Sequence, residues 1–333
     1  MRMKVLYHGN CFDGLASAAI FSRFYREAIR REATFRYGPL MHRADNLFHD
    51  ELFDGDENAI VDFKYSSSPR LTWWFDHHES AFLSREDEAH FRRDRSGRKF
   101  HDPSFKSCTK FIATVAAQRF DWRCPDLDEL VHWADVIDGA QYPDARAAVE
   151  MREPALRVLL VIEASREPHI AERIIHDFQT KSLSEIARQP YIADRFQSLY
   201  RWHLKTIDVI RKEARSRDGV VYFDVSEHPV EGYNKFIPYY LFPDVRYSVG
   251  VSLSSSRAKV SVGSNPWSPR PRAHNLAKIC ERYGGGGHAA VAAISFPPDQ
   301  IEAARRVAQE IAAELRGEGV ESRDEERKIE VSE

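Results

Sequence analysis

Residues 71–78 read Leu-Thr-Trp-Trp-Phe-Asp-His-His, an apolar segment that ends on three polar side chains. Shorter apolar segments at 3–8 and 59–61 likewise end on His8 and on Asp62. Short apolar strands separated by helical patterns predict a parallel α/β sheet. Ligands of such sheets bind outside the carboxyl ends of the strands. We therefore expect the polar side chains after these three strands to converge on one site.

The chain has 333 residues, of which 43% are hydrophobic, and its formal net charge is −3. This length predicts two domains at about 150 residues each, and the composition excludes an overall disordered or collagen-like chain. The near-neutral charge neither requires nor excludes a nucleic-acid partner. The four cysteines lie far apart without a CxxC pair, so neither a disulfide framework nor a zinc knuckle is expected. We expect a cytoplasmic protein without a signal peptide or a membrane span.

The hydrophobic pattern of the sequence changes at Asp218-Gly219, where a long region with helical periodicity is followed by strand-like segments. We predict an α/β protein with a parallel-sheet domain over 1–217, which includes a connecting helix. A smaller α/β domain is expected over 218–316, with a cleft between the two domains. Residues 317–333 are predicted to form a disordered acidic tail.

Asp76-His77-His78 combines a carboxylate with two imidazoles, a ligand set that suits Mn²⁺, Zn²⁺ or Fe²⁺. A surface turn that happens to carry two histidines is the alternative. Because neighbouring residues at a strand exit point in different directions, one imidazole could bind a metal while the other faces a substrate.

Further candidate ligands lie at three other places. The string His8-Gly9-Asn10-Cys11-Phe12-Asp13-Gly14 follows the first strand and opens a helix, so His8 and Asp13 are candidates; a turn with a helix cap is the alternative. Asp62 ends an apolar strand and could instead cap a loop. Asp135 and Asp138 lie three residues apart and so share a helix face. Together, His8, Asp13, Asp62, His77 and Asp135 could hold two divalent ions about 3.5–4 Å apart.

Two further segments could contact phosphate. Lys106, Ser107 and Thr109 begin a predicted helix whose N-terminus favours anions, with helix capping as the alternative. Residues 284–288 read Gly-Gly-Gly-Gly-His between a predicted helix and an apolar strand, which favours a structured loop over a linker. Its exposed backbone N–H groups could line an anion or a nucleobase edge.

The chain resembles the DHH phosphoesterase family with its DHH-associated C-terminal domain. Five motifs carry the resemblance, in this order: HGNCFDG (the first motif), Asp62, DHH at 76–78, a later aspartate (the fourth motif) and GGGGH at 284–288. That family includes RecJ-like exonucleases, nano-RNases, phosphoadenosine phosphate phosphatases and cyclic-dinucleotide phosphodiesterases. The resemblance extends to about Ala313.

The resemblance implies a role for each motif residue. It implies metal ligands at His8, Asp13, Asp62 and His77, and Asp62 would bridge two ions. The ligand of the fourth motif would be Asp135, with Asp138 as the competing choice. His78 would lie near the scissile phosphate, and Asp76 would support the imidazoles or the metal. Gly285, Gly286, Gly287 and His288 would grip the substrate. The family often carries an arginine in its second domain, and Arg257 would replace it here at a shifted position.

The expected function is a divalent-metal-dependent hydrolase that cleaves phosphodiester or phosphomonoester bonds in short single-stranded oligonucleotides or small nucleotides, as a nano-RNase or exonuclease does. The expected cofactor is one or two ions, Mn²⁺ or alternatively Mg²⁺ or Co²⁺. A polyphosphate or pyrophosphate hydrolase is an alternative. A non-catalytic nucleotide-binding protein is another, because the first motif has Asn10, Cys11 and Phe12 where many members have acids. The sequence is compatible with a homodimer but does not require one.

Overall fold

The computed structural model describes residues 1–41, 48–230 and 232–317. Their contacts divide the chain into two compact units. The first comprises Met1–Tyr142 and Met151–Leu199, and the second comprises Pro143–Glu150 and the chain from Tyr200 onward. The predicted acidic tail lies outside the described residues except for Gly317. No helix among the described residues is long and apolar enough to cross a membrane.

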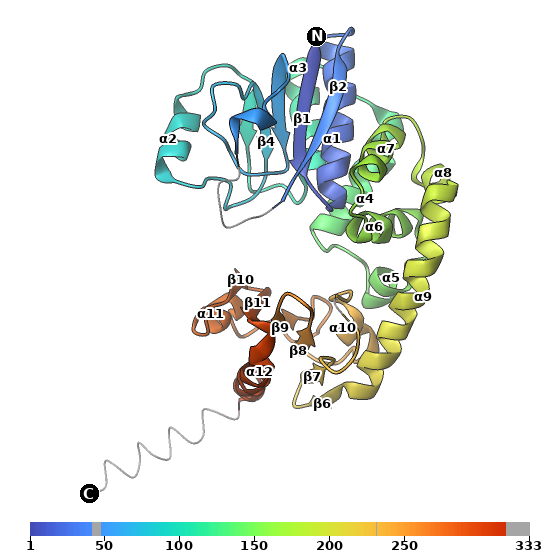
Figure 1. Cartoon of the computed structure of the whole chain (residues 1–333), viewed down its shortest axis with the longest axis vertical. Coiled ribbons are helices and arrows are strands. Elements are labelled where there is room, and N and C mark those ends of the chain that lie inside the picture. Colours follow the sequence, from blue (N-terminus) through green and yellow to red (C-terminus); the bar gives the residue numbers. More distant parts are fainter. Residues whose placement is uncertain (42–47, 231, 318–333) are drawn as a thin grey trace, which may run out of the picture. The chain divides into compact units, whose positions relative to one another are not determined.

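The first unit is built on a five-stranded sheet with the order β2-β1-β3-β4-β5, and all four pairings are parallel (Figure 1). The predicted α/β fold with a parallel sheet is therefore confirmed. The strands are β1 (Arg2–His8), β2 (Thr34–Leu40), β3 (Glu57–Val61), β4 (Trp73–Asp76) and β5 (Lys99–His101).

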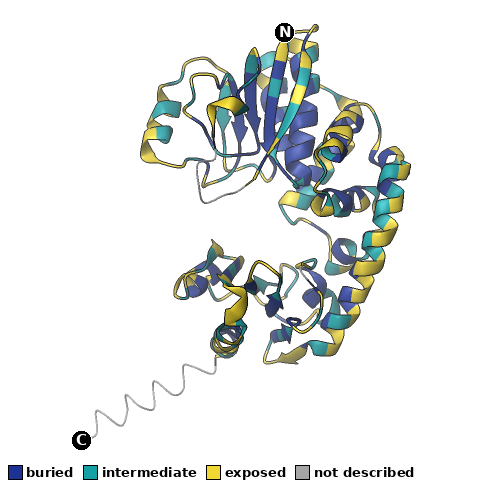
Figure 2. Cartoon of the chain, viewed as in Figure 1, coloured by how far each residue is buried: buried dark blue, intermediate teal, exposed yellow. Residues whose placement is uncertain are grey.

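Both faces of this sheet are covered, as an all-parallel sheet requires. Alternate residues of β4 point to opposite faces, so Trp73 and Phe75 join the larger apolar core while Trp74 joins a second one. The larger core lies beneath α1 and α3, and the central strands β1, β3 and β4 are buried along most of their length (Figure 2). The edge strands β2 and β5 are mostly half-buried or exposed. The helices of this unit are α1 (Phe12–Phe24), α2 (Arg85–Arg93), α3 (Cys108–Phe120), α4 (Asp128–Asp138), α6 (Pro154–Ala164), α7 (Pro168–Phe178) and α8 (Leu183–Ala187).

The helix α9 (Pro190–Glu213) begins in the first unit and continues in the second. The second unit carries a six-stranded mixed sheet with the order β10-β11-β9-β8-β7-β6. Its strands are β6 (Arg215–Arg217), β7 (Val220–Asp224), β8 (Tyr247–Leu253), β9 (Ala258–Ser264), β10 (Gly286–His288) and β11 (Val291–Phe296). Its helices are α5 (Ala145–Glu150), α10 (Ile237–Leu241), α11 (Leu276–Glu281) and α12 (Ile301–Arg316).

Four strands differ from the sequence-based expectation, and all four lie at sheet edges. β2 and β5 are the edge strands of the parallel sheet. Gly38 and Pro39 interrupt the apolar pattern of β2, and Pro is tolerated in strands mainly at sheet edges. In the second sheet, the exposed β6 forms one edge and β10 forms the other. β10 lies within the segment predicted to be a glycine loop. β10 pairs antiparallel with β11.

Candidate active site

The candidate site lies at the carboxyl edge of the parallel sheet. His8 is the last residue of β1, Asp62 follows β3 directly, and Asp76 is the last residue of β4. Because these three strands are neighbours in the sheet, their ends bring the motif side chains together. We call these side chains the carboxylate–histidine cluster. Its members are His8, Asp13, Asp62, His77, His78 and Asp138.

The turn between β1 and α1 brings Asp13 under the end of β1. A Cβ at Gly14 would lie 2.1 Å from the carbonyl oxygen of His8, so only glycine allows this approach. The Asp13 carboxylate accepts hydrogen bonds from the backbone N–H groups of Cys108 (2.7 Å) and Thr109 (3.0 Å). The N-terminus of α3 therefore binds a carboxylate of the protein itself, and Ser107 caps the same helix.

Asp62 is 1% exposed and has a left-handed backbone with φ of 57°. Its two oxygens face two different imidazoles. Oδ2 lies 3.3 Å from Nδ1 of His8, and Oδ1 lies 3.4 Å from Nε2 of His77. Neither oxygen accepts a hydrogen bond from the residues that the structure describes. Both oxygens are therefore left available to a cation.

The imidazole of His77 is oriented by the backbone. Its Nδ1 lies 3.1 Å from the carbonyl oxygen of Phe105, which can only accept, so Nδ1 carries the proton of the neutral ring. Nε2 then faces Asp62 (3.4 Å), Asp138 (3.4 Å) and Asp13 (3.7 Å), and its lone pair is available to a cation when the ring is neutral. A backbone carbonyl that fixes the tautomer in this way is typical of metal-binding histidines.

Asp76 is fully buried and positions the two histidines that follow it. Its Oδ1 accepts hydrogen bonds from the backbone N–H groups of His77 (2.9 Å) and His78 (3.3 Å), and it lies 2.7 Å from Nδ1 of His78. Nδ1 of His78 is thus engaged by a carboxylate. Burial lowers the pKa of His78, but the hydrogen bond and charge of Asp76 outweigh that effect and raise it.

The remaining pKa shifts reflect crowding of buried carboxylates. Burial raises the pKa of Asp13 well above its usual value, and the charges of Asp62 and Asp138 raise it further. Burial, together with the charge of Asp62, raises the pKa of Asp138 to about 6. Burial also acts on Asp62, but its contacts with His77 and His8 outweigh it and lower the pKa. Burial lowers the pKa of His77, whereas contact with these carboxylates raises it to about 10.

The cluster fits divalent metal ions. Carboxylate and imidazole ligands are the usual set for such ions, and the buried oxygens of Asp62 and the buried Nε2 of His77 make no hydrogen bond with described residues. Buried charges of this kind need a cation or another partner. Three overlapping groups of side chains could each hold an ion: His8 with Cys11 and Asp62, Asp62 with His77 and His78, and Asp13 with His77 and Asp138.

The two aspartates of α4 lie in different surroundings. Oδ2 of Asp138 lies 3.4 Å from Nε2 of His77. Asp135, the expected ligand, instead accepts a hydrogen bond from Nζ of Lys110 (2.7 Å) and one from Ser107 (3.4 Å). Asp135 therefore ties α4 to α3, and the competing residue Asp138 is the one that the structure brings to the cluster.

The expected substrate-binding residues lie in the second unit. Gly286, Gly287 and His288 form β10, and Gly285 precedes it, where a Cβ would lie 2.4 Å from the carbonyl oxygen of Ala293. Arg257 is exposed in the loop between β8 and β9, and its guanidinium lies 3.5 Å from Oγ of Ser295. His288 pairs with Val291 on β11, whereas Arg257 contacts Ser295, four residues further along the same strand. Arg257 and His288 therefore lie toward opposite ends of β11.

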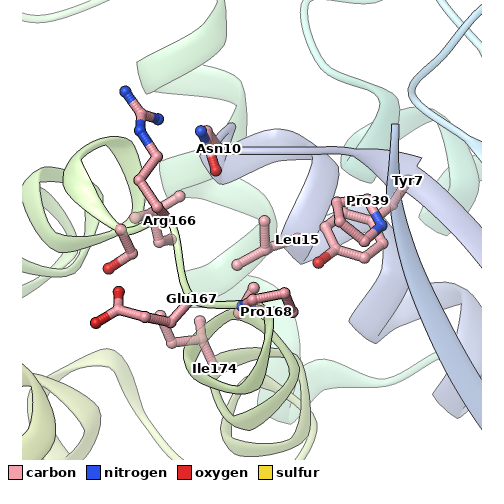
Figure 3. Close-up of a pocket in the computed structure, with 11 residues that line it drawn as sticks. Tyr7, Asn10, Leu15, Pro39, Arg166, Glu167, Pro168 and Ile174 are labelled. Carbon is pink, nitrogen blue, oxygen red and sulfur yellow. The ribbon is translucent and has the colours of Figure 1, made fainter. Parts of the chain in front are cut away.

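A small pocket lies against the first motif (Figure 3). Asn10, which has φ of 55°, reaches its polar rim, and Leu15 and Ile174 line its apolar part. In the amide orientation that satisfies both partners, Asn10 donates to the carbonyl oxygen of Ser165 (3.2 Å) and accepts from the guanidinium of Arg166. The sequence carried no signal for these contacts or for the role of the Phe105 carbonyl, because the residues involved are distant in the chain.

No protein-family model and no curated protein sequence matches the chain. Solved structures of the same fold do match. PggH, a pGpG-specific phosphodiesterase from Vibrio cholerae, is 18% identical over 96% of this chain and 100% of its own, with a TM-score of 0.68. RecJ from Thermus thermophilus, in complex with Mn²⁺, is 14% identical over 94% of this chain and 52% of its own, with a TM-score of 0.54.

A DHH domain from a protein assigned to a family of ribosomal proteins also has a TM-score of 0.54, with 12% identity over 93% of this chain and 86% of its own. At these identities the likeness concerns the fold. The chain therefore has the fold of DHH-domain structures, and the resemblance inferred from its motifs is confirmed at that level.

Proposed function

We propose that this protein is a divalent-metal-dependent phosphoesterase that hydrolyses short oligonucleotides or small nucleotides. One observation carries the proposal: the two oxygens of the buried Asp62 face His8 and His77 and make no hydrogen bond with described residues. The fold neighbours support it, since one is a pGpG-specific phosphodiesterase and another is a RecJ protein in complex with Mn²⁺.

In this proposal Asp13, Asp62, His77 and Asp138 hold the ions, and His8 completes the set. The distances favour Asp138 over Asp135 for the position on α4. Bound ions would supply an activated water and neutralise charge on the phosphoryl group. The choice of Mn²⁺ among divalent ions, and the number of ions, belong to the proposal.

The protein's own side chains prepare the site. The backbone N–H groups of Cys108 and Thr109 hold Asp13 in place, and the Phe105 carbonyl keeps Nε2 of His77 directed at the carboxylates. Asp76 holds His78 by its Nδ1, and we propose that the half-exposed ring of His78 contacts the scissile phosphate.

The exposed edge formed by Gly286, Gly287 and His288 is the proposed substrate grip, because an edge strand of glycines leaves backbone N–H groups accessible to phosphate or to a base. Arg257 stays a second, separate candidate for phosphate contact. The cytoplasmic location, the homodimer and the cleft between the two domains stay predictions from the sequence.

The test incubates the full chain and Mn²⁺ with pGpG, pAp, a cyclic dinucleotide, pyrophosphate, and labelled RNA and DNA of increasing length. We expect the fastest hydrolysis for a dinucleotide or another short substrate, and loss of activity in folded His77→Ala and Asp62→Ala. Preferential hydrolysis of pyrophosphate would favour the alternative enzyme. Nucleotide binding without hydrolysis across several metals would show a non-catalytic protein.

A further inference from the structure

The thiol of Cys11 lies beside the carboxylate–histidine cluster, in the short loop between β1 and α1. Its Sγ lies within 4.8 Å of one ligand atom each of His8 and Asp62. Cys11 is half-buried, directly precedes α1, and has an extended backbone. Its side chain makes no capping hydrogen bond to that helix, so a capping role does not account for its position.

Asp62 provides an independent reason to place a cation beside this thiol. Its side chain is 1% exposed, and its Oδ2 points toward His8 at 3.3 Å without accepting a hydrogen bond from described residues. An ionised carboxylate at this depth is strongly disfavoured unless a positive charge or hydrogen bonds offset its burial. His77 lies on the Oδ1 side of this carboxylate, and a cation held between Asp62, His8 and Cys11 would offset its charge on the Oδ2 side.

The loop is fixed so that consecutive side chains have different neighbours. Asn10 adopts a left-handed backbone and its amide is bound by Ser165 and Arg166 at the rim of the pocket (Figure 3). The next residue, Cys11, then approaches Asp62 instead. Asn10 and Cys11 therefore present their side chains to different neighbours.

We propose that Cys11 is a metal ligand, binding as a thiolate together with His8 and Asp62, and that its sulfur shifts the preference of this position from Mn²⁺ toward Zn²⁺, Fe²⁺ and Co²⁺. Sulfur ligands favour these softer ions over Mn²⁺ and Mg²⁺. When the ion binds, the S–H proton passes to solvent and the thiolate sulfur takes its place on the metal. One sulfur, one nitrogen and one oxygen ligand leave a position open for water, as in catalytic zinc sites. This inference rests on the proposed metal-dependent function.

Cys124 offers a matched control for Cys11. It is also half-buried in the first unit and lies near a carboxylate, since its Sγ is 2.8 Å from Asp126. The guanidinium of Arg23 contacts the same sulfur at 3.0 Å, so a cation of the protein already occupies its surroundings. Substitution of Cys124 therefore tests the general effect of removing a half-buried thiol.

The experiment titrates the metal-stripped full chain with Co²⁺ and records its near-ultraviolet absorption. We expect a sulfur-to-cobalt charge-transfer band in the wild type and in Cys124→Ser, and none in Cys11→Ser. In Cys11→Asp we expect the preference for Zn²⁺ over Mn²⁺, measured by competition, to fall at least about tenfold, because a hard oxygen replaces the sulfur.

A second measurement uses the wild type alone and does not depend on the folding of any variant. Mass spectrometry would follow alkylation of each cysteine by iodoacetamide with and without Zn²⁺, and we expect protection of Cys11 but not of Cys124. A wild-type protein that shows no charge-transfer band, or an unprotected Cys11, overturns the proposal. A band without hydrolysis of any substrate would instead overturn the proposed function and leave the ligand assignment intact.

Discussion

At the scale of single residues, the two aspartates of α4 are predicted to behave differently. Asp138 lies 3.4 Å from Nε2 of His77, so Asp138→Asn should remove a metal ligand and lower activity by more than the roughly 10–100-fold cost of losing a residue that only supports a ligand. Asp135 is buried and paired with the half-exposed Lys110, so Asp135→Asn should cost about 1–3 kcal/mol of stability.

Isothermal titration with Mn²⁺ and a hydrolysis assay distinguish the two variants, with circular dichroism as the check on folding. Equal loss of metal affinity in both would contradict the assignment of Asp138. Loss confined to Asp135→Asn would restore the ligand expected from the sequence.

The sequence predicted the cluster better than it predicted this choice. His8, Asp62 and Asp76 could be identified because each follows or ends an apolar strand, and the carboxyl ends of neighbouring parallel strands meet. The choice between Asp135 and Asp138 depends on the position of Lys110, which a spacing of three residues does not reveal.

At the scale of elements, the β1–α1 turn depends on a glycine that touches the strand before it. In Gly14→Ala the new Cβ would lie 2.1 Å from the His8 carbonyl oxygen, so α1 or β1 must shift. We expect a loss of about 1–3 kcal/mol or more in the free energy of unfolding, as for other overpacked core positions.

Gly286→Ala is the matched control, because no heavy atom lies within 4 Å of a Cβ there. Urea unfolding should show a change of no more than about 0.5 kcal/mol. If the β10 edge grips substrate, the same variant should raise KM. A stable Gly14→Ala protein would contradict the packing argument, and an unchanged KM in Gly286→Ala would contradict the proposed grip.

Strands at the sheet edges were the elements that sequence patterns predicted least well. β2 carries Gly38 and Pro39 and half-exposed positions, so it lacks the continuous apolar run of β3 and β4. Its strand conformation comes from pairing with β1 over seven residues, a tertiary effect that local patterns do not contain.

At the scale of the whole chain, the second unit is assembled from two separated segments, and a histidine joins them. Nε2 of His203 on α9 donates to the carbonyl oxygen of Val149 at 2.8 Å. Burial lowers the pKa of His203. The unfolded chain therefore takes up this proton first, so stability is fully present above the usual histidine pKa of about 6.5 and falls as the pH drops below it.

The prediction is a larger loss of unfolding free energy in the wild type than in His203→Gln when the pH falls from about 7.5 to about 5.5. Glutamine keeps a donor but does not titrate. Urea midpoints at the two pH values measure the difference. The same loss in both proteins would show that His203 does not contribute to the acid sensitivity.

Metal removal should destabilise the first unit, which contains the proposed ligands, and leave the second unit unchanged. The charge of Asp62 raises the pKa of both Asp13 and Asp138, and a divalent ion among these carboxylates would offset their repulsion. An ion at about 100 times its dissociation constant stabilises the native state by about 2.7 kcal/mol. That stabilisation should appear as slower hydrogen exchange where the ion's ligands are attached.

Hydrogen exchange with Mn²⁺ present, compared with the stripped protein, should therefore slow at the carboxyl ends of β1, β3 and β4 and at the end of α4. Exchange in β8 and β9 should stay unchanged, since both strands lie in the second unit. Asp62→Asn should abolish the difference, because the ions would lose the carboxylate that faces both histidines. Protection spread evenly over both units, or retained in Asp62→Asn, would contradict a metal centre built on this residue.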